Sequence, residues 1–486
     1  MRIPFLRRKQ KKVPITAKLK REIFIDVGED EERAALIEDG KLVELFMERK
    51  TDKDVVGNIY LARVVNVVKG LQSVFLDAGL EKNVFLSFSD IPFLREKGIK
   101  RGDEAVIQIT KESIGTKSAK ATADISLPGR FLVHTPFFRR TAISRQITNH
   151  EERNRLNGIM KEAAPVDAGF IIRTEAEGHD RKDLIRDARY LMNLWDNIKK
   201  KSGVKAPALL YKAFGLVFYV VRELFTDDVE RLVINSAREY RDILNYVGMV
   251  APELRRKISL YREKSPLFGT YGIEEQITDM KEQKVPLPCG GSIVMEQTEA
   301  LVSIDVNTGK FTRGKNQEET AFIANCEAAR EIARQIRLRN TGGIIIVDFV
   351  DMRNKKHNMR LLEILKEVLK KDKAKTDVLP ITRLGLLEMT RERKKESVFA
   401  ILCEPCPYCK GSGMVFSDMT MYIKIKKELL KKAPGMGSPA LNVFMHPRVA
   451  ALFDENTVRE ISRAVRKTIR IRPDYKLHQE EYEIAP

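Results

Sequence analysis

Cysteine and tryptophan are scarce in this sequence, which contains five cysteines and one tryptophan in 486 residues. Because the cysteines form no regular framework, a disulfide-stapled secreted scaffold is excluded, and we expect a protein of a reducing compartment, the cytoplasm. No apolar run is long enough to cross a bilayer, so we expect no transmembrane segment. The first residues are basic and lack an apolar signal core, which predicts a disordered basic arm over 1–20 rather than a secretory signal.

Positive charge, by contrast, is in excess. Lysine and arginine number 87 against 68 aspartates and glutamates, which gives a net charge of +19. Such a surplus predicts an anionic partner, either nucleic acid or a membrane surface. Ribosomal and chaperone-like proteins have the same balance, so the charge alone does not indicate an enzyme. The length is sufficient for several domains.

Two segments of the second half have the same unusual pattern. The first, 342–352, has two glycines and then a β-branched run, which predicts a central buried strand interrupted by Asp348. A carboxylate inside such a strand costs several kcal/mol unless a partner neutralises it. The second segment, 301–309, is a short strand that carries Asp305, and Asn307 lies two residues later on the same face.

Apolar residues at helical spacing over 316–340 connect these strands, so the sequence predicts a βαβ unit with parallel strands. Asp305 and Asp348 should then lie at the carboxyl ends of their strands, where open α/β sheets bind ligands. Two carboxylates without a nearby histidine or cysteine suit Mg²⁺. The following loop adds Lys310, Arg313 and Lys315, and a metal beside a basic loop indicates a phosphodiester site. The alternative is that both aspartates only cap turns.

Four stretches together carry a family resemblance: SIDVNTGKFTRGKN, EAAREIARQIRLRNTGGIIIVDFVDM, ITRLGLLEMTRER and CPYCKGSG. They closely resemble the ribonuclease E/G family of bacterial endoribonucleases, and the resemblance extends from about Arg21 to the end. It implies a multidomain α/β and α+β chain. The implied parts are a ribonuclease H-like subdomain without an active site of its own (21–54 and 206–279), an inserted OB-fold β-barrel (55–123), a 5′-sensor (124–205), a deoxyribonuclease I-like catalytic α/β domain (280–400), a zinc link (401–416) and a small C-terminal α/β domain for oligomer contacts (417–486).

The first 123 residues also have their own strand signals. REIFIDVG and KLVELFME alternate like a strand pair, separated by a charged helical or turn segment and a hairpin turn at Asp39-Gly40. Several short strands over 55–123 predict a small barrel. Phe75 and Phe85 fall on the polar faces of their strands, where aromatic side chains stack on unpaired bases. The alternative is that another domain covers both rings.

The resemblance also implies RNA contacts and a pocket for a terminal phosphate. Lys111 and Lys117 follow the barrel strands at positions that the family uses against RNA, and Arg145 matches a further RNA-contacting arginine. Guanidinium, hydroxyl and backbone N–H groups suit a phosphate. Where the best-known member completes the pocket with arginine, this sequence aligns lysine, which keeps the charge but loses the bidentate fork. The matching pocket residues are Gly129, Val133, Arg173, Thr174 and Lys375.

Cys406 and Cys409 stand in a Cys-x₂-Cys pair followed by Gly-x-Gly, a metal-knuckle pattern. A glutaredoxin-like redox motif is the alternative, but the following KGSG cannot continue the helix that such a motif requires. Structural zinc takes four ligands, so these two thiols supply half a site, and a second chain is the simplest completion. The family dimerises through such a shared zinc, which implies a homodimer or a dimer of dimers. Cys403 is an unexpected third thiol.

The sequence therefore predicts a Mg²⁺-dependent endoribonuclease for single-stranded RNA, in which Asp305 and Asp348 hold the metal and Asn307 orients the ligands or the phosphate. The resemblance implies products with 5′-phosphate and 3′-hydroxyl ends, 5′-monophosphate sensing, and roles in rRNA and tRNA maturation and in mRNA decay. The competing interpretations are a non-catalytic RNA-binding or ribosome-associated protein and a metal phosphoesterase for small substrates.

Overall fold

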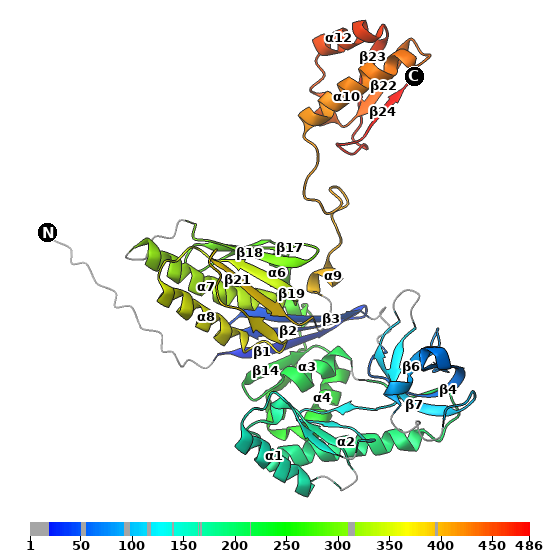
Figure 1. Cartoon of the computed structure of the whole chain (residues 1–486), viewed down its shortest axis with the longest axis vertical. Helices are drawn as coiled ribbons and strands as arrows, with labels where there is room; N and C mark the ends of the chain where they lie inside the picture. Colours follow the sequence, from blue (N-terminus) through cyan, green and yellow to red (C-terminus); the bar gives the residue numbers. More distant parts are fainter. Residues whose placement is uncertain are drawn as a thin grey trace, which may run out of the picture. The chain divides into compact units, whose positions relative to one another are not determined.

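The structure is a computed structural model that describes residues 19–49, 55–91, 98–113, 118–138, 140–163, 165, 168–213, 215–309, 316–393 and 397–486. Two compact units, 1–401 and 402–486, make up the chain and are treated separately below (Figure 1). None of the helices in these ranges is long and apolar enough to cross a membrane.

A five-stranded mixed sheet forms the base of the first unit. Its order is β15-β14-β1-β2-β3, and β1, β14 and β15 run parallel. The strands are β1 (Arg21–Val27), β2 (Glu31–Glu38), β3 (Lys41–Arg49), β14 (Val229–Ile234) and β15 (Ile258–Leu260). The helices of this region are α3 (Leu216–Leu224), α4 (Ala237–Val250), α5 (Leu267–Thr270) and α6 (Ile273–Asp279).

The prediction for the segment between the first two strands was wrong. This segment forms β2 rather than a helix or turn, because its apolar residues over 34–37 are buried in the sheet. The predicted hairpin turn is present: Asp39 and Gly40 have φ values of 49° and 79°. Two consecutive positive φ values define the tight turn that joins twisted antiparallel strands.

The predicted barrel is present and has five strands, closed by pairing of β4 with β7. Alternate residues of each strand, such as Val74, Leu76 and Leu86, fill the interior. The strands are β4 (Ile59–Val68), β5 (Ser73–Asp77), β6 (Val84–Ser87), β7 (Glu104–Lys111) and β8 (Lys120–Thr122). A sixth strand, β13 (Ala208–Tyr211), pairs with β4 although it lies within 206–279.

A small sheet with two helices follows the barrel. Its order is β11-β12-β10-β9, and its core joins that of α1 and α2. The elements are β9 (Leu127–Pro128), β10 (Leu132–His134), β11 (Thr141–Ile143), α1 (His150–Ala163), β12 (Phe170–Ile172) and α2 (Arg181–Lys201).

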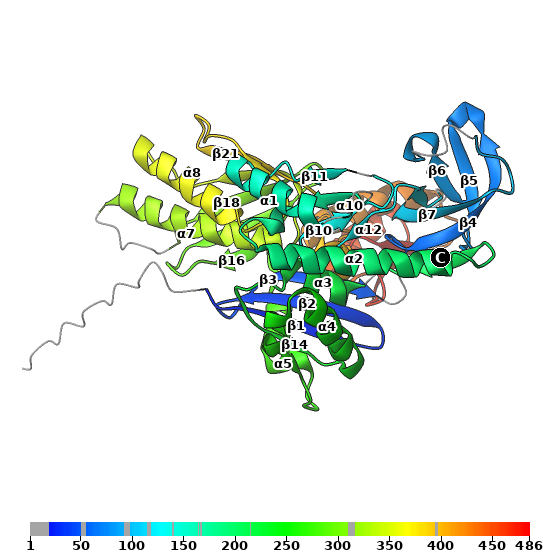
Figure 2. The ribbon, with the colours of Figure 1, turned by 90° about the horizontal axis from the view of Figure 1, so that it is seen from below.

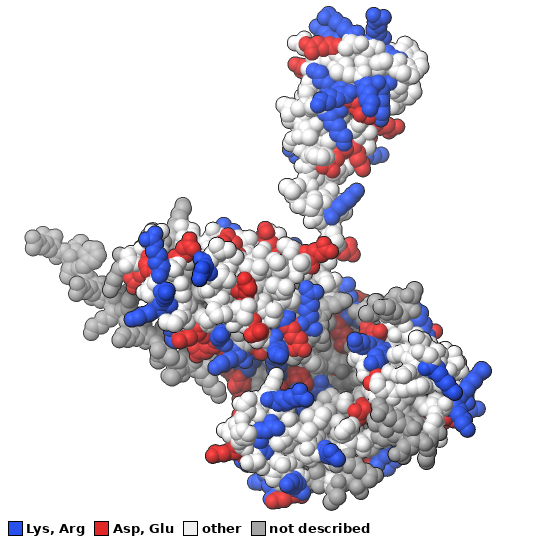
Figure 3. Space-filling view, viewed as in Figure 1, with Lys and Arg blue, Asp and Glu red and all other residues white. Residues whose placement is uncertain are grey.

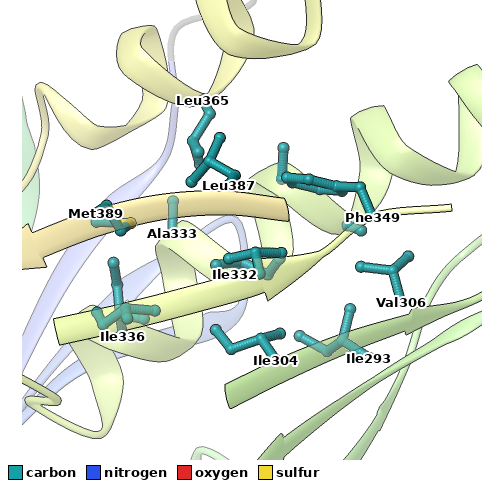
Figure 4. Packing of buried hydrophobic residues seen from close by; sticks show 14 of the residues in the cluster. Ile293, Ile304, Val306, Ile332, Ala333, Ile336, Phe349, Leu365, Leu387 and Met389 are labelled. Atoms are coloured by element: carbon teal, nitrogen blue, oxygen red, sulfur yellow. The ribbon is translucent and has the colours of Figure 1, made fainter. Parts of the chain in front are cut away.

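The predicted βαβ unit is the centre of a six-stranded sheet, in which β18 and β19 are parallel neighbours. Helices α7 (Gln317–Leu338) and α8 (Lys355–Leu369) lie side by side in both ribbon views (Figure 2). Ile332 and Ile336 of α7 pack on the sheet beside Ile304 (Figure 4). In order across the sheet, the strands are β16 (Lys284–Pro286), β17 (Ser292–Gln297), β18 (Leu301–Asn307), β19 (Gly343–Asp348), β21 (Leu386–Arg391) and β20 (Thr376–Val378).

The second unit is a small α/β domain, as predicted. One face of its sheet, of order β23-β22-β24, carries the core that α10 and α12 complete. The elements are α10 (Asp418–Lys432), β22 (Ala440–Met445), α11 (Pro447–Ala450), α12 (Glu455–Val465), β23 (Thr468–Pro473) and β24 (Tyr482–Ala485), while α9 (Val398–Leu402) links the two units.

Candidate functional site

Asp305 and Asp348 are direct partners in the register of the parallel strands β18 and β19. Both stand at or near the carboxyl ends of their strands, which is the edge where α/β sheets place ligands. Asn307 lies on the same face as Asp305 and donates a hydrogen bond from Nδ2 to Asp305 Oδ2 at 2.6 Å. The structure thus brings together the three residues that the sequence predicted for the catalytic centre.

The expectation that these carboxylates lie in buried surroundings was wrong. Both side chains are exposed, because α7 and α8 cover only the opposite face of the sheet. Along β19 the residues alternate: Ile345 and Val347 are fully buried, whereas Ile344 on the face of Asp348 is 50% exposed. The apolar run is therefore a one-sided strand, and the Asp348 side chain stays in contact with solvent.

Asn325 holds the segment after Asp348 in place. This fully buried residue of α7 accepts a hydrogen bond from Val350 N–H at 3.0 Å and donates one to Val350 O at 2.8 Å. Sequence reasoning missed it, although an asparagine among the alanines of an apolar helix face is a recognisable signal. The carboxamide fixes the backbone two residues beyond Asp348.

The loop after Asn307 begins in a tight approach to the turn before β17. A Cβ at Gly291 would lie 2.5 Å from Asn307 O, and a Cβ at Gly309 would lie 2.8 Å from Gly290 O. Glycine is therefore required at both positions. Lys310 and Arg313, predicted beside the metal, lie outside the described residues, as does Lys315.

Three arginines of the segment 381–393 differ in their position relative to this edge. Arg383 is exposed in the turn before β21, whose residue Leu386 is the register partner of Asp348. Arg391 is instead buried at the other end of the sheet, where it pairs with Asp372 at 2.7 Å. Arg393 donates to Gly342 O at 2.9 Å, again at the start of β19. Only Arg383 lies at the carboxyl edge.

The donor set at this edge fits Mg²⁺ better than a metal that demands a full protein cage. Within the described ranges, no group of three or more His, Cys, Asp and Glu residues is arranged to hold a metal ion. Mg²⁺ keeps several waters and binds through one or two carboxylates plus substrate phosphates. Asp305 and Asp348 offer that number of carboxylates, on an exposed face that a phosphodiester can reach.

The barrel carries a row of aromatic and basic side chains on its outer face. Phe75 and Phe85 are register partners, both partly exposed, with ring centroids 5.8 Å apart. Phe85 is in turn the partner of Lys120, and Lys120 is the partner of Lys111. Lys120 was not predicted, because only the pairing of β6 with β8 places it in this row. Lys117 lies outside the described residues.

This row is a local feature rather than part of one large basic patch. On the face shown in Figure 3, basic and acidic side chains are interspersed over the first unit. The surplus positive charge alone therefore does not locate a binding surface there. Stacking rings beside lysines, as in the row on the barrel, are what an unpaired nucleic acid strand requires.

The predicted phosphate pocket centres on Arg173, just after β12. Its guanidinium donates to Gly129 O at 2.7 Å and makes two hydrogen bonds to Glu223, at 2.6 and 3.1 Å. Burial opposes the ionisation of Glu223, but its bonds to Arg173 and Arg222 outweigh this effect and lower its pKa to about 2. Glu223 is therefore ionised throughout the neutral range.

Thr174 and Arg145 adjoin this cluster, and Val133 lies on the neighbouring strand. The Thr174 hydroxyl is 3.0 Å from Ser144 Oγ and 3.1 Å from Gln146 Oε1. Arg145 lies between those two residues and is exposed. Val133, in β10, is the register partner of Ile171 in β12.

The three backbone amides that follow Gly129 are engaged within the protein. Arg130, Phe131 and Leu132 donate their N–H groups to the fully buried carboxylate of Asp187. Burial raises the pKa of Asp187, and these three amides oppose that shift. A Cβ at Gly129 would lie 2.6 Å from the Asp187 oxygens, so this turn has no room for any residue larger than glycine. These three amides are therefore turned toward Asp187 rather than toward an anion at Arg173.

Among the described residues, no hydrogen bond or ion pair joins Lys375 to Arg173 or Glu223. Its backbone pairs with Glu392, and it lines a hollow beside Gly343 and Thr390. The lysine that reaches the cluster is Lys373, whose Nζ lies 3.9 Å from a carboxylate oxygen of Glu175 and 4.0 Å from one of Glu223. Lys373 and Lys375 are two residues apart, and the sequence alone does not show which of them reaches Arg173.

In the second unit, Cys406 and Cys409 flank the start of a tight turn. Gly413 N–H lies 3.3 Å from Cys409 Sγ, and positive φ values at Lys410, Gly411 and Gly413 make that turn. Backbone N–H groups of Cys409 and Tyr408 lower the pKa of the Cys406 thiol and so favour the thiolate that binds metal.

His478 lies against this knuckle but has no nitrogen to spare. Its Nε2 lies 2.8 Å from Tyr408 O, and its Nδ1 accepts from Glu480 N–H at 3.1 Å. Cys403 is exposed. Within the residues that the structure describes, no third His, Cys, Asp or Glu joins the two thiols in a group that could hold a metal ion.

Paired carboxylates at the ends of parallel strands, together with a barrel that displays rings and lysines, define a nucleic-acid-cleaving hydrolase. A sequence model of the ribonuclease E/G family matches residues 126–394. Ribonuclease G of Escherichia coli strain K12 is 35% identical over 486 residues, which is 96% of this chain and 99% of that protein. Ribonuclease G of Haemophilus influenzae is 36% identical over 485 residues, with the same coverage.

Ribonuclease E of a Nostoc species is 35% identical over 403 residues, 80% of this chain and 58% of that protein. The chain belongs to the ribonuclease E/G family and is an endoribonuclease of that family, which confirms the prediction from its motifs. A purely RNA-binding protein and a phosphoesterase for small substrates are thereby set aside.

Proposed function

We propose that this endoribonuclease is Mg²⁺-dependent and hydrolyses single-stranded RNA at Asp305, Asp348 and Asn307. The register pairing of the two aspartates on an exposed sheet face carries the proposal. A bound Mg²⁺ supplies Lewis-acid polarisation of the scissile phosphate and lowers the pKa of water. The two carboxylates hold that ion, and Asn307 keeps the Asp305 carboxylate oriented through its 2.6 Å hydrogen bond.

RNA reaches this edge from two other surfaces of the first unit. On the outer face of the barrel, Phe75 and Phe85 stack on unpaired bases, and the neighbouring lysines neutralise the phosphates. This arrangement favours single-stranded substrates. The Arg173 cluster, with Thr174 and Arg145 beside it, recognises the 5′-monophosphate end. The products carry 5′-phosphate and 3′-hydroxyl ends, and the substrates are rRNA and tRNA precursors and mRNA.

The assembly that we propose is a homodimer or dimer of dimers in the cytoplasm. Cys406 and Cys409 of each chain supply half of a shared zinc site, in keeping with their exposed knuckle geometry. The scarcity of cysteine in the sequence agrees with a reducing compartment. The strand order of the first sheet, with three antiparallel strands and two parallel additions, supports the ribonuclease H-like assignment.

A short unpaired RNA, prepared with either a 5′-monophosphate or a 5′-hydroxyl, tests the function. Cleavage is expected with Mg²⁺ and not with EDTA, and it should be faster for the 5′-monophosphate form. Mass spectrometry of the fragments should find 5′-phosphate and 3′-hydroxyl ends. Cleavage in EDTA contradicts the metal mechanism, whereas equal rates for the two RNAs remove only the end sensing.

Phe75→Ala or Phe85→Ala should weaken binding of unpaired RNA by about 1–3 kcal/mol. Because both rings are on the outer face, the thermal midpoint should hardly change. Leu76→Ala is the matched control in the same strand, since Leu76 is fully buried and its loss should lower the midpoint. Fluorescence anisotropy and thermal melting measure the two effects. A large drop in midpoint with unchanged affinity shows that the rings belong to the core.

A further inference from the structure

The Arg173 cluster, defined as Arg173, Arg222, Lys373, Glu175 and Glu223, already holds an anion of its own chain. Glu223 bonds to Arg173 and Arg222 and is almost buried, with an 11% exposed side chain. Glu175 lies on the solvent side with a 32% exposed side chain. Its Oε2 is 3.3 Å from Arg173 Nε, and its Oε1 is 3.9 Å from Lys373 Nζ.

The two carboxylates therefore play different parts. Glu223 is fixed by a two-bond pairing with the Arg173 fork, which sets the orientation of the guanidinium. Glu175 makes looser contacts and stands between Arg173 and Lys373, whose side chains are 17% and 42% exposed. With Gly129 O also bound, each nitrogen of the Arg173 guanidinium has an acceptor in the protein. Glu175 is the most exposed of these acceptors, so it is the one that an incoming phosphate displaces most easily.

The net charge of the cluster also indicates that Glu175 is the group an incoming phosphate displaces. Three cations against two carboxylates leave a net charge of +1. An internal phosphodiester carries about one negative charge, which this balance already matches. A terminal phosphate monoester carries about −1.5 to −2 at neutral pH, and it is matched only when the Glu175 carboxylate has moved away. Glu175 thus opposes the ligand that the cluster is proposed to sense.

We propose that Glu175 is an intramolecular competitor for the terminal phosphate, and that Lys373, rather than Lys375, is the second cation of the pocket. The proposal rests on the end sensing put forward above and specifies its regulation. The Glu175 carboxylate occupies the anion position between Arg173 and Lys373 when no RNA end is bound. A 5′-monophosphate takes that position and drives the carboxylate into solvent. Glu175 thereby sets how strongly the enzyme prefers phosphorylated ends.

Glu175→Gln tests this role, because it removes the charge and keeps the size of the side chain. Binding is measured in EDTA, by anisotropy of a fluorescent ten-nucleotide RNA with a 5′-monophosphate or a 5′-hydroxyl. The ratio of the two affinities should rise roughly five-fold over the wild type, the effect of one exposed ionic contact. Glu177→Gln is the matched control, since Glu177 is exposed in the same turn and no described contact links it to Arg173. It should leave the ratio unchanged.

The lysines give the converse test. Lys373→Gln should lower the affinity ratio by a similar factor, and Lys375→Gln should not. A ratio that is the same in Glu175→Gln and Glu177→Gln, or that falls with Lys375→Gln alone, overturns the proposal while leaving end sensing intact. A ratio of one in the wild type and in Glu175→Gln, with Mg²⁺-dependent internal cleavage still present, rejects end sensing itself and this proposal with it.

Discussion

Asp348→Asn is expected to abolish RNA cleavage while leaving RNA affinity within a few-fold of the wild type. The metal acts on the charge that develops in the transition state more than on the bound substrate, so kcat carries the loss. Lewis-acid stabilisation is worth several kcal/mol, which corresponds to about three orders of magnitude in rate. Asp305→Asn should behave alike, because the two residues are register partners.

Because both carboxylates are exposed, this test separates a loss of catalysis from a loss of stability. Neither variant buries an unpaired group, so the thermal midpoint should stay close to that of the wild type. Asp377→Asn is the matched control, since Asp377 is exposed on the same open face two strands away, opposite Thr390. It makes the same charge change and should retain cleavage. Full activity of either Asp305→Asn or Asp348→Asn with Mg²⁺ would end the assignment of the metal site.

The order of elements around this centre was predictable because local patterns determine it. Alternating residues and a helical repeat between two short strands imply a βαβ unit, and chain connectivity makes its strands parallel. Asp305, Asn307 and Asp348 were found together for that reason. The faces of Phe75 and Phe85 were also predictable, because side chains alternate along a strand with period two.

The sequence predictions were wrong or incomplete where tertiary contacts determine the structure. An apolar run such as that of β19 does not reveal whether one or both faces of a sheet are covered, so Asp348 was expected in buried surroundings. The segment before Asp39 forms a strand because its apolar residues Ala34 and Leu36 pack in one core with residues of α3, which is distant in sequence. Lys120 joins the barrel row only through the pairing of β6 with β8.

The choice between Lys373 and Lys375 also could not be made from the sequence. Both lie on the turn that leads into β20, and a displacement of two residues moves the charge from one pocket to another. The buried ion pair of Asp372 with Arg391 at 2.7 Å and the pairing of Lys375 with Glu392 fix where that turn runs. Alignment placed the lysine by its neighbours in sequence, whereas the contact with Glu175 and Glu223 depends on the fold.

Replacing Cys406 and Cys409 by serine should remove zinc and shift the protein toward the monomer. Thiolates bind zinc far better than hydroxyls do, and a structural site contributes its binding energy to the assembly that forms it. The hydrogen bonds that lower the pKa of the Cys406 thiol favour its ligating form, so zinc should also be retained at mildly acidic pH. The core of the second unit lies in α10, α12 and the sheet, so the variant should still fold.

The stoichiometry decides whether the zinc is shared. One chain offers two thiols in the knuckle, and His478 has both ring nitrogens engaged, so the expected content is one zinc per two chains. Metal analysis combined with light-scattering mass measures it, and chelation should reproduce the effect of the double substitution. Cys403→Ser is the control, and it should keep both zinc and mass if that thiol is a bystander. One tightly bound zinc per chain at monomeric mass would reject the shared site and would indicate that Cys403 and a fourth group of the same chain complete it.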